Sequence, residues 1–202
     1  MGKEQRDFGL TMIVGPMFSG KTTELLRLLG RYKMAGYSVA LLKPSIDKRY
    51  SNREVVSHDG LKMEAIVIEP NYSGLANVLK NLEDVDVIGI DELQFFEPEL
   101  TTVDLILRIS LQKKVYVAAL NLDFKGEPWE IVKELLPRAD EIISLQAVCT
   151  YVDPNTGKKC GAPATRTQRL IDGKPAPRDA PRIMVGGRES YESRCRRHHE
   201  VP

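Results

Sequence analysis

Short apolar runs alternate with longer amphipathic segments over the first two thirds of the chain. The apolar runs show no polar alternation, which is typical of strands buried on both faces. The segments between them repeat apolar residues at helical spacing, as Leu25, Leu28 and Leu29 do. Strands that alternate with helices predict an α/β fold, a mostly parallel sheet with helices on both faces. The expected strands cover residues 10–14, 39–42, 65–68, 85–90 and 115–120, and the expected helices cover residues 22–36, 74–82, 100–109 and 129–136.

The pattern changes near the end of the chain, where helical spacing stops and the cysteines begin. A turn signal at residues 171–174 lies between two short β-like stretches, at residues 165–170 and 182–185. We therefore expect two units. The first is an α/β unit over residues 1–145, and the second is a small β-rich lobe over residues 146–202.

Charge is divided unevenly between these two parts. The formal net charge is +1, but residues 1–145 carry 18 Lys or Arg against 22 Asp or Glu, whereas residues 146–202 carry 11 against 6. A basic lobe could contact phosphates or nucleic acid. A solvated small domain with Arg-rich loops has the same composition, so charge alone does not choose a partner.

The overall composition is that of a soluble globular protein, with 42% hydrophobic and 28% charged residues. No apolar run approaches the roughly 18 residues that a membrane span needs. The first residues, MGKEQRDFG, are too polar for a signal peptide. We therefore expect a cytoplasmic protein with no membrane partner.

A phosphate-binding motif lies between the first expected strand and the first expected helix. The residues GPMFSGKT match G-x-x-x-x-G-K-[ST] in the structural context that this motif requires. Backbone N–H groups would surround phosphate oxygens, Lys21 would reach the β- and γ-phosphates, and the Thr22 hydroxyl would bind Mg²⁺. The alternative, a Gly-rich turn with a surface lysine, does not explain the strand and helix on either side. The predicted nucleotide site comprises Gly15, Pro16, Met17, Phe18, Ser19, Gly20, Lys21 and Thr22.

Two carboxylates, Asp91 and Glu92, follow a buried strand, at the sheet edge where open α/β folds hold their ligands. Asp91 is therefore the expected partner of Mg²⁺. Glu92, one residue further on, could take a proton from the group that attacks the γ-phosphate. This pair indicates phosphoryl transfer without choosing the acceptor, and the alternative is that both acids only cap the next segment.

Three cysteines and a histidine could form a tetrahedral Cys₃His zinc site: Cys149, Cys160, Cys195 and His198. An odd number of cysteines in a reducing compartment argues against a disulfide framework. A metal would stabilise a lobe that has few large apolar residues for a core. Buried thiols without a metal are the alternative, and His199 could replace His198, although the C-x₂-H spacing favours His198.

Several motifs together resemble the type II thymidine kinase family, over nearly the whole chain from about Phe8 to His199. These motifs are GPMFSGKT, DKRYS, IDELQFF, AALNLDF and GGRESYESRCRRHH. The resemblance implies a P-loop NTPase-like α/β fold with a small β-rich zinc-binding lobe. It also implies an enzyme that transfers a phosphoryl group from ATP to the 5′-hydroxyl of thymidine, with a long loop that closes over the nucleoside.

The resemblance further implies roles for individual residues. Glu92 would be the general base on the 5′-hydroxyl, while Lys21, Thr22 and Asp91 would serve ATP and Mg²⁺. Asp47 and Arg49 would lie near the sugar and the phosphate. The base and sugar pocket would be lined by Met17, Leu120, Phe124, Thr165 and Tyr191, with backbone groups near Gly186 and Gly187.

The four candidate zinc ligands also match the family, with two departures. The family commonly has C-x₂-C as its first pair, whereas residues 151–159 resemble an inserted turn here, and the last ligand is His where other members have Cys. The turn Asp-Pro-Asn-Thr-Gly can return Cys160 to Cys149. The family also suggests a homotetramer and feedback inhibition by dTTP.

Two other classes of function compete with a nucleoside kinase. One is a nucleic-acid-stimulated ATPase whose basic lobe grips phosphates, and the other is a zinc-stabilised binding module in which nucleotide is only structural. The lobe lacks the aromatic series that stacks single-stranded bases, so no nucleic-acid partner is expected. The intact set of Lys21, Thr22, Asp91 and Glu92 disfavours a module without catalysis.

Overall fold

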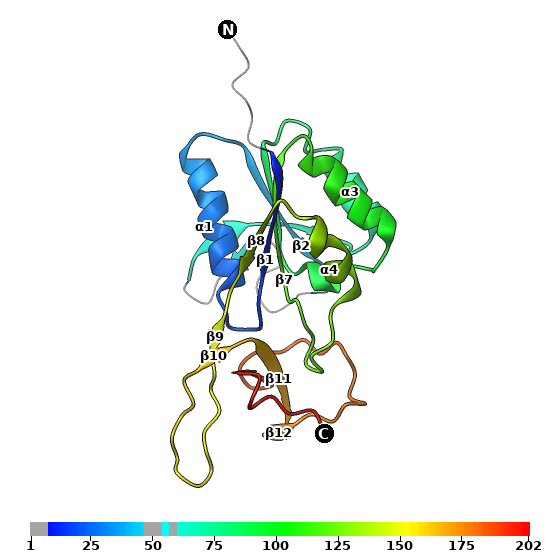
Figure 1. Cartoon of the computed structure of the whole chain (residues 1–202). Helices are drawn as coiled ribbons and strands as arrows, with labels where there is room; N and C mark the ends of the chain where they lie inside the picture. The colour runs from blue at the N-terminus through cyan, green and yellow to red at the C-terminus, as the bar shows by residue number, and fades with distance from the viewer. Residues whose placement is uncertain (1–7, 47–53, 57–59) are drawn as a thin grey trace.

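A six-stranded parallel sheet forms the centre of the computed structural model, which describes residues 8–46, 54–56 and 60–202 (Figure 1). The strand order is β5-β2-β6-β7-β1-β8, and each neighbouring pair is parallel. The strands are β1 (Gly9–Val14), β2 (Val39–Pro44), β5 (Ile66–Ile68), β6 (Val87–Ile90), β7 (Lys114–Ala119) and β8 (Glu141–Ser144).

Helices cover both faces of this sheet, as the sequence predicts. One face packs against α1 (Lys21–Met34), and the other packs against α2 (Tyr72–Leu79), α3 (Leu100–Ser110) and α4 (Glu130–Leu135) (Figure 1). Short 3₁₀ turns follow β6 and α4, at Leu93–Phe95 and Leu136–Arg138. Among the helices that the structure describes, none combines the length and apolar character needed to cross a membrane.

The central strand β1 shows why the apolar runs lack alternation. All six of its residues are buried, and Leu10, Met12 and Val14 join the core under α2, α3 and α4. Ile13 instead joins the core under α1. Successive side chains of a strand point to opposite faces, so a strand covered on both faces needs apolar residues at every position.

The C-terminal lobe consists of short antiparallel strands below the sheet (Figure 1). The strand β11 pairs with β12 on one side and with β13 on the other, which confirms the expected turn at residues 171–174. The strands are β9 (Ala147–Val148), β10 (Pro163–Ala164), β11 (Arg166–Ile171), β12 (Lys174–Pro175) and β13 (Tyr191–Arg194). The strands β3 (Glu54–Val56) and β4 (Lys62–Glu64) form a further antiparallel pair. In the sequence they lie between β2 and β5.

The expected strand at residues 182–185 is wrong, because this segment is irregular. Its carbonyl groups are not paired with a neighbouring strand. The carbonyls of Pro181 and Arg182 accept from Arg169, and the carbonyl of Met184 accepts from Tyr191. Side chains therefore fix this backbone in place of a sheet ladder.

The expected division after residue 145 falls between β8 and β9, where the parallel sheet ends and the small antiparallel sheets begin. One hydrogen bond crosses this division at the P-loop, where the Met17 N–H donates to Thr167 Oγ1 at 3.0 Å. The two parts thus meet at the predicted nucleotide site. Whether they fold as separate units stays a prediction.

The helix α2 begins two residues earlier than its apolar spacing predicts, because Asn71 caps it. The Asn71 side chain accepts a hydrogen bond from the Gly74 N–H at 2.8 Å, which satisfies a donor in the first helical turn. A Cβ at Gly74 would lie 2.2 Å from the Glu69 carbonyl oxygen. The close approach of this turn therefore requires glycine.

We expect Gly74→Ala to lower the free energy of unfolding by about 1 to 3 kcal/mol, because the new methyl group overlaps a backbone oxygen. Intrinsic helix propensity alone predicts the opposite, a gain of about 1 kcal/mol. Gly30→Ala in α1 is the matched control, since nothing lies within 4 Å of its added Cβ and the variant should be at least as stable as the parent. Urea denaturation of the three proteins measures the difference, and a stabilised Gly74→Ala would contradict this explanation.

Candidate active site

The P-loop has the geometry of a phosphate-binding loop. Gly20 is the N-cap of α1 and adopts a left-handed conformation with φ 85°, which glycine adopts without strain. Because it has no side chain, the first N–H groups of the helix stay accessible to an anion. The Lys21 ammonium donates to the Pro16 carbonyl at 2.7 Å, so it lies over the loop that would hold the phosphates.

A hydroxyl and a carboxylate meet at the end of β6. The Thr22 hydroxyl donates to Asp91 Oδ2 at 3.2 Å, which joins the P-loop to the strand. Asp91 is buried, and this burial together with the negative charge of Glu92 raises its pKa to about 7. A divalent cation bound here would stabilise the charged carboxylate, so the donor set fits Mg²⁺.

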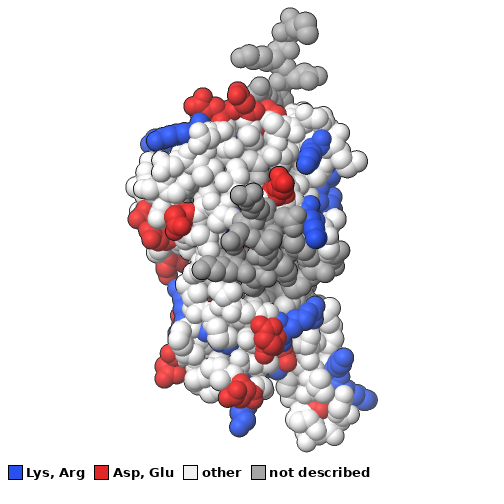
Figure 2. All heavy atoms as spheres, turned by 180° about the vertical axis from the view of Figure 1, so that it is seen from behind, with Lys and Arg blue, Asp and Glu red and all other residues white. Residues whose placement is uncertain are grey.

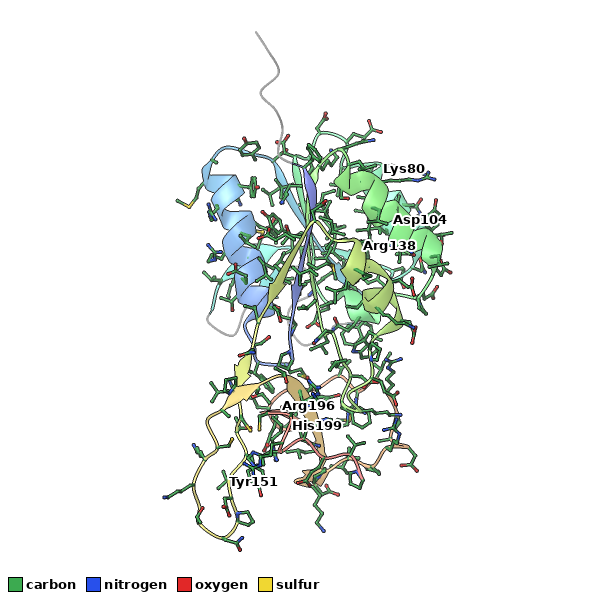
Figure 3. All side chains as sticks on the ribbon, viewed as in Figure 1. Lys80, Asp104, Arg138, Tyr151, Arg196 and His199 are labelled. Atoms are coloured by element: carbon green, nitrogen blue, oxygen red, sulfur yellow. The ribbon has the colours of Figure 1, made fainter. Side chains whose placement is uncertain are left out.

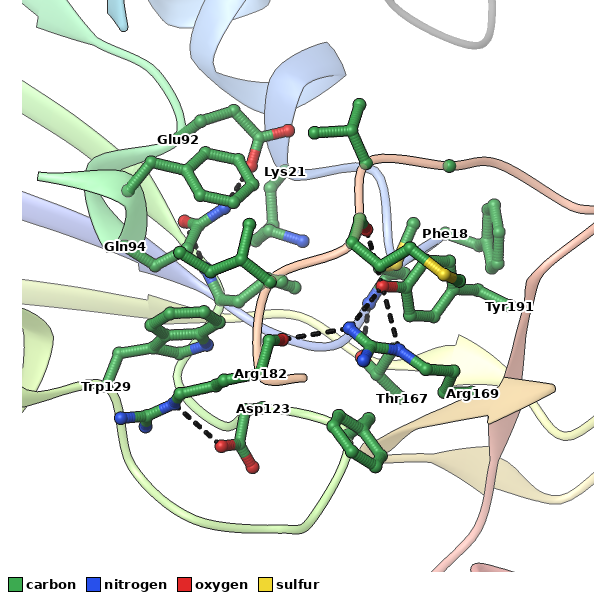
Figure 4. A pocket seen from close by; sticks show the side chains of 18 of the residues that line it. Phe18, Lys21, Glu92, Gln94, Asp123, Trp129, Thr167, Arg169, Arg182 and Tyr191 are labelled. Carbon is green, nitrogen blue, oxygen red and sulfur yellow. Dashed lines mark hydrogen bonds and ion pairs between the residues drawn. The ribbon is translucent and has the colours of Figure 1, made fainter. Parts of the chain in front are cut away.

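Glu92 is held in an uncommon backbone conformation, with φ 53° and ψ 43°. Its carboxylate accepts a hydrogen bond from the Gln94 side-chain amide (Figure 4). The Gln94 amide oxygen in turn accepts from the Leu120 N–H at 3.0 Å, which fixes the orientation of the amide. Gln94 therefore positions the carboxylate at the pocket. The sequence alone indicates no role for this residue, although it stands inside the IDELQFF motif.

A pocket lies between this edge of the sheet and the C-terminal lobe (Figure 4). It brings together most of the residues that the sequence predicts. Those that line it are Met17, Phe18, Gly20, Lys21, Thr22, Glu92, Leu120, Phe124, Gly186 and Tyr191.

Other predicted residues do not line this pocket. Gly187 lies next to it, and Thr165 lies outside it, whereas Thr167 two residues further on does line it. Thr167 is the residue whose hydroxyl contacts the P-loop. Thr165 lies between β10 and β11, and its role stays a prediction. Asp47 and Arg49 lie outside the described residues.

Three further pocket residues form one group that sequence analysis did not place there. The Arg182 guanidinium lies 4.4 Å from the centre of the Trp129 ring, and its Nε pairs with Asp123 Oδ2 at 2.8 Å. Asp123 is buried and the Arg182 side chain is partly exposed, so only the carboxylate of this pair is shielded from solvent. Trp129 belongs to the apolar core, as expected of a helix anchor, but it also lines the pocket. The contacts of Arg182 with Trp129 and Asp123 join residues far apart in the chain, so no local sequence pattern predicts them.

The structure brings the four candidate zinc ligands together. The ligand atoms of Cys149, Cys160, Cys195 and His198 all lie within 4.8 Å of one another. His198 Nδ1 lies 3.7 Å from Cys149 Sγ and 3.5 Å from Cys195 Sγ. Bonds of about 2.0 Å to nitrogen and 2.3 Å to sulfur place such atoms about 3.6 Å apart around tetrahedral zinc, so the geometry fits this metal.

His199 is engaged elsewhere. Its Nε2 contacts the carbonyl oxygen of Phe124 at 2.8 Å, which ties the end of the chain to the loop after β7. Figure 3 shows His199 inside the lobe and Tyr151 on the long loop beside it. The Tyr151 ring stacks on His198 at 4.0 Å, which orients the imidazole toward the cysteines. Of the two histidines, the structure therefore selects His198 for the cluster.

Comparison with known proteins agrees with this geometry. The thymidine kinase family profile matches residues 9–199. Thymidine kinase of Thermococcus kodakarensis is 53% identical over 197 residues, 96% of this chain and 94% of that protein. Thymidine kinase of Pyrobaculum aerophilum is 49% identical over 193 residues, 96% of this chain and 99% of that protein.

A third relative is the thymidine kinase of Coprothermobacter proteolyticus, 47% identical over 199 residues, 98% of this chain and 93% of that protein. Among solved structures, AMPPCP-bound DnaA from Aquifex aeolicus is 15% identical with a TM-score of 0.39, over 69% of this chain and 41% of that one. The family profile and the three thymidine kinases, each 47% to 53% identical over nearly the full length, all point to one family. The chain belongs to the thymidine kinase family.

Proposed function

We propose that this protein transfers the γ-phosphoryl group of ATP to the 5′-hydroxyl of thymidine and releases dTMP and ADP. The observation that carries this proposal is the set of residues that line one pocket. Lys21, Thr22 and Glu92 line it on the sheet side, and the rings of Phe124 and Tyr191 line it on the other side. A phosphate donor and a flat, partly apolar acceptor can thus meet in it.

The P-loop would hold the phosphates of ATP. Its backbone N–H groups and the positive end of the α1 dipole attract anions, and Lys21 would exchange the Pro16 carbonyl for phosphate oxygens. Thr22 and Asp91 would hold Mg²⁺. This ion would neutralise negative charge on the β- and γ-phosphates.

Glu92 would accept the proton of the 5′-hydroxyl as its oxygen attacks phosphorus. Gln94 donates to Oε2 of this carboxylate and keeps it in one orientation. A positioned base needs to lie within hydrogen-bond reach of the proton that it removes. The backbone conformation of Glu92 and its contact with Gln94 supply that positioning.

We expect Glu92→Gln to reduce kcat by about 10² to 10⁴-fold, nearer the lower value because a loose transition state depends less on the base. ATP binding should change little. The matched control is Glu97→Gln, which alters an exposed carboxylate nearby and should leave kcat unchanged. Steady-state kinetics and ATP titration measure both effects, and an unchanged kcat in Glu92→Gln would remove this residue from the mechanism.

Thymine would be recognised by the covering segment, which we define as residues 181–187. The segment passes over the pocket, and Arg182, Ile183, Met184, Val185 and Gly186 line it. Within the described part of the chain, the backbone N–H groups of residues 183–186 donate to no protein acceptor. They are therefore available to the carbonyl groups of a pyrimidine edge.

We expect kcat/KM to decrease in the order thymidine, deoxyuridine, deoxycytidine. Deoxyuridine lacks only a methyl group, worth about 1 kcal/mol in an apolar site. Cytosine presents the opposite donor and acceptor pattern, so buried groups would stay unpaired at about 1 to 3 kcal/mol each. Coupled assays of ADP release with each nucleoside test the order, and equal efficiency for deoxycytidine and thymidine would overturn this scheme of recognition.

We also propose that the Cys₃His cluster binds one structural Zn²⁺. The metal would cross-link the two ends of the loop after β9 to the turn after β13, in a lobe whose core is small. We expect about one zinc per chain in protein purified without chelator. Elemental analysis that finds none would refute the site.

Replacement of one ligand should distinguish the cluster from the neighbouring His199, which lies outside it. Cys195→Ser should lose zinc and speed hydrogen exchange in the C-terminal lobe before exchange in the parallel sheet changes. His199→Asn is the control and should retain the metal, since this side chain contacts the Phe124 carbonyl. Zinc lost from His199→Asn but retained by Cys195→Ser would contradict the assignment.

A nucleic-acid-stimulated ATPase is less well supported. On the face shown in Figure 2, acidic and basic side chains lie beside each other over the C-terminal lobe, without a continuous basic track. A groove for a nucleic-acid backbone needs such a track. ADP production stimulated by DNA and not by thymidine would favour this alternative.

Family membership also supports a homotetramer, feedback inhibition by dTTP and a cytoplasmic location, which we include in the proposal. dTTP, the product of later phosphorylations, would compete with thymidine for this pocket if its thymine base bound the covering segment. The division into residues 1–145 and 146–202 is part of the proposal as well, with the pocket between the two units.

A further inference from the structure

We propose that Arg169 is a positioning residue, whose buried guanidinium holds the covering segment in place over the pocket before a nucleoside binds. The inference rests on the proposed function in one respect, namely that this segment covers the substrate. The contacts themselves belong to the protein without ligand.

The guanidinium of Arg169 projects from β11 toward the covering segment (Figure 4). The residue is 2% exposed. Its Nη2 donates to the Arg182 carbonyl at 2.8 Å, and its Nη1 donates to the Pro181 carbonyl. Both carbonyls belong to the start of the segment, so one side chain fixes where the segment enters the pocket.

Tyr191 extends this attachment. Its hydroxyl accepts from Arg169 Nε at 3.1 Å and from Nη2 at 2.7 Å, and it donates to the Met184 carbonyl at 2.6 Å. A hydroxyl that accepts and donates in this way links the cation to a third backbone position. The segment is thus held at Pro181, Arg182 and Met184.

The charge of Arg169 makes this attachment strong. Within the described residues no carboxylate contacts its guanidinium, because the buried Asp123 pairs with Arg182 instead. The cation lies 4.1 Å from the centre of the Phe124 ring and 5.2 Å from that of Tyr191. A buried cation without a counter-charge needs its hydrogen-bond acceptors. Departure of the segment would remove two of them, so the closed position is favoured.

This arrangement also affects the carbonyl oxygens and the N–H groups of the segment differently. Arg169 and Tyr191 occupy carbonyl oxygens, whereas the N–H groups of residues 183–186 donate to no protein group in the described part of the chain. This edge of the pocket therefore presents hydrogen-bond donors to a ligand. It therefore prefers a base whose facing edge carries carbonyl acceptors, as thymine and uracil do.

Limited proteolysis of the ligand-free protein tests the proposal. Trypsin can cut after Arg182 and after Arg188, and cleavage there requires local opening of the segment. We expect Arg169→Lys to speed cleavage at these two bonds by about tenfold, the effect of losing one charge-assisted hydrogen bond. The matched control is Arg166→Lys on the same strand, because among the described residues the hydrogen bonds of the Arg166 guanidinium go to the adjacent Thr165. The control should be cut at the parental rate.

Kinetics and a second substitution complete the test. We expect Arg169→Lys to raise KM for thymidine about tenfold or more while kcat changes by less than about threefold. Tyr191→Phe should also speed cleavage of the ligand-free protein, and the double variant should be cut at least as fast as either single variant, because the hydroxyl holds Met184 whereas the guanidinium holds Pro181 and Arg182 directly.

Two outcomes would overturn the proposal. If KM rises but cleavage of the ligand-free protein stays at the parental rate, Arg169 contacts the substrate directly and does not position the segment. If cleavage rises equally after Lys158 and Lys159, on the distant loop, the substitution unfolds the lobe as a whole. A parental enzyme that lacks thymidine-dependent ADP production would contradict the proposed function instead, and the proteolysis result would stand apart from it.

Discussion

The parallel register of β1, β6 and β7 is the constraint on which the site depends. Ile90 pairs with Val117, and Val14 pairs with Ala119, so the three strands end at the same edge of the sheet. The P-loop, the Asp91–Glu92 pair and the loop after β7 all begin there. A change of register in any one strand would move one of these three groups, for which we propose phosphate, metal and nucleoside binding, away from the others.

The central strands could be predicted from the sequence because their signal is local. A strand buried on both faces must be apolar throughout, and the G-x-x-x-x-G-K-T motif fixes a loop within eight residues. The strand β8 (Glu141–Ser144) gave no such signal, since it lies at the edge of the sheet and is largely exposed. The strand β13 alternates buried and half-buried residues but is mostly polar, with Tyr191 as its only large apolar side chain.

The covering side of the pocket could be predicted only in part. The family resemblance points to Tyr191 and Phe124, which line the pocket, and to Thr165, which does not, whereas Thr167 does. Thr165 lies between β10 and β11 and Thr167 lies within β11, and both are threonines in similar local sequence. Gln94 and Arg169 act through atoms far apart in the chain, namely the Leu120 N–H and the Pro181 and Arg182 carbonyls. Local patterns carry no record of such contacts.

The left-handed backbone of Glu92 has a consequence for how this fold can change over time. Asp91 beside it is a buried carboxylate, and Phe18 in the P-loop also has a positive φ of 64°, so three neighbouring residues are held in conformations or environments that oppose folding. Selection for stability alone would replace them, because each substitution by a relaxed residue is favourable to the folded state. Under the proposed function the Asp91–Glu92 pair resists such replacement, so gains in heat resistance would arise in the cores on either side of the sheet.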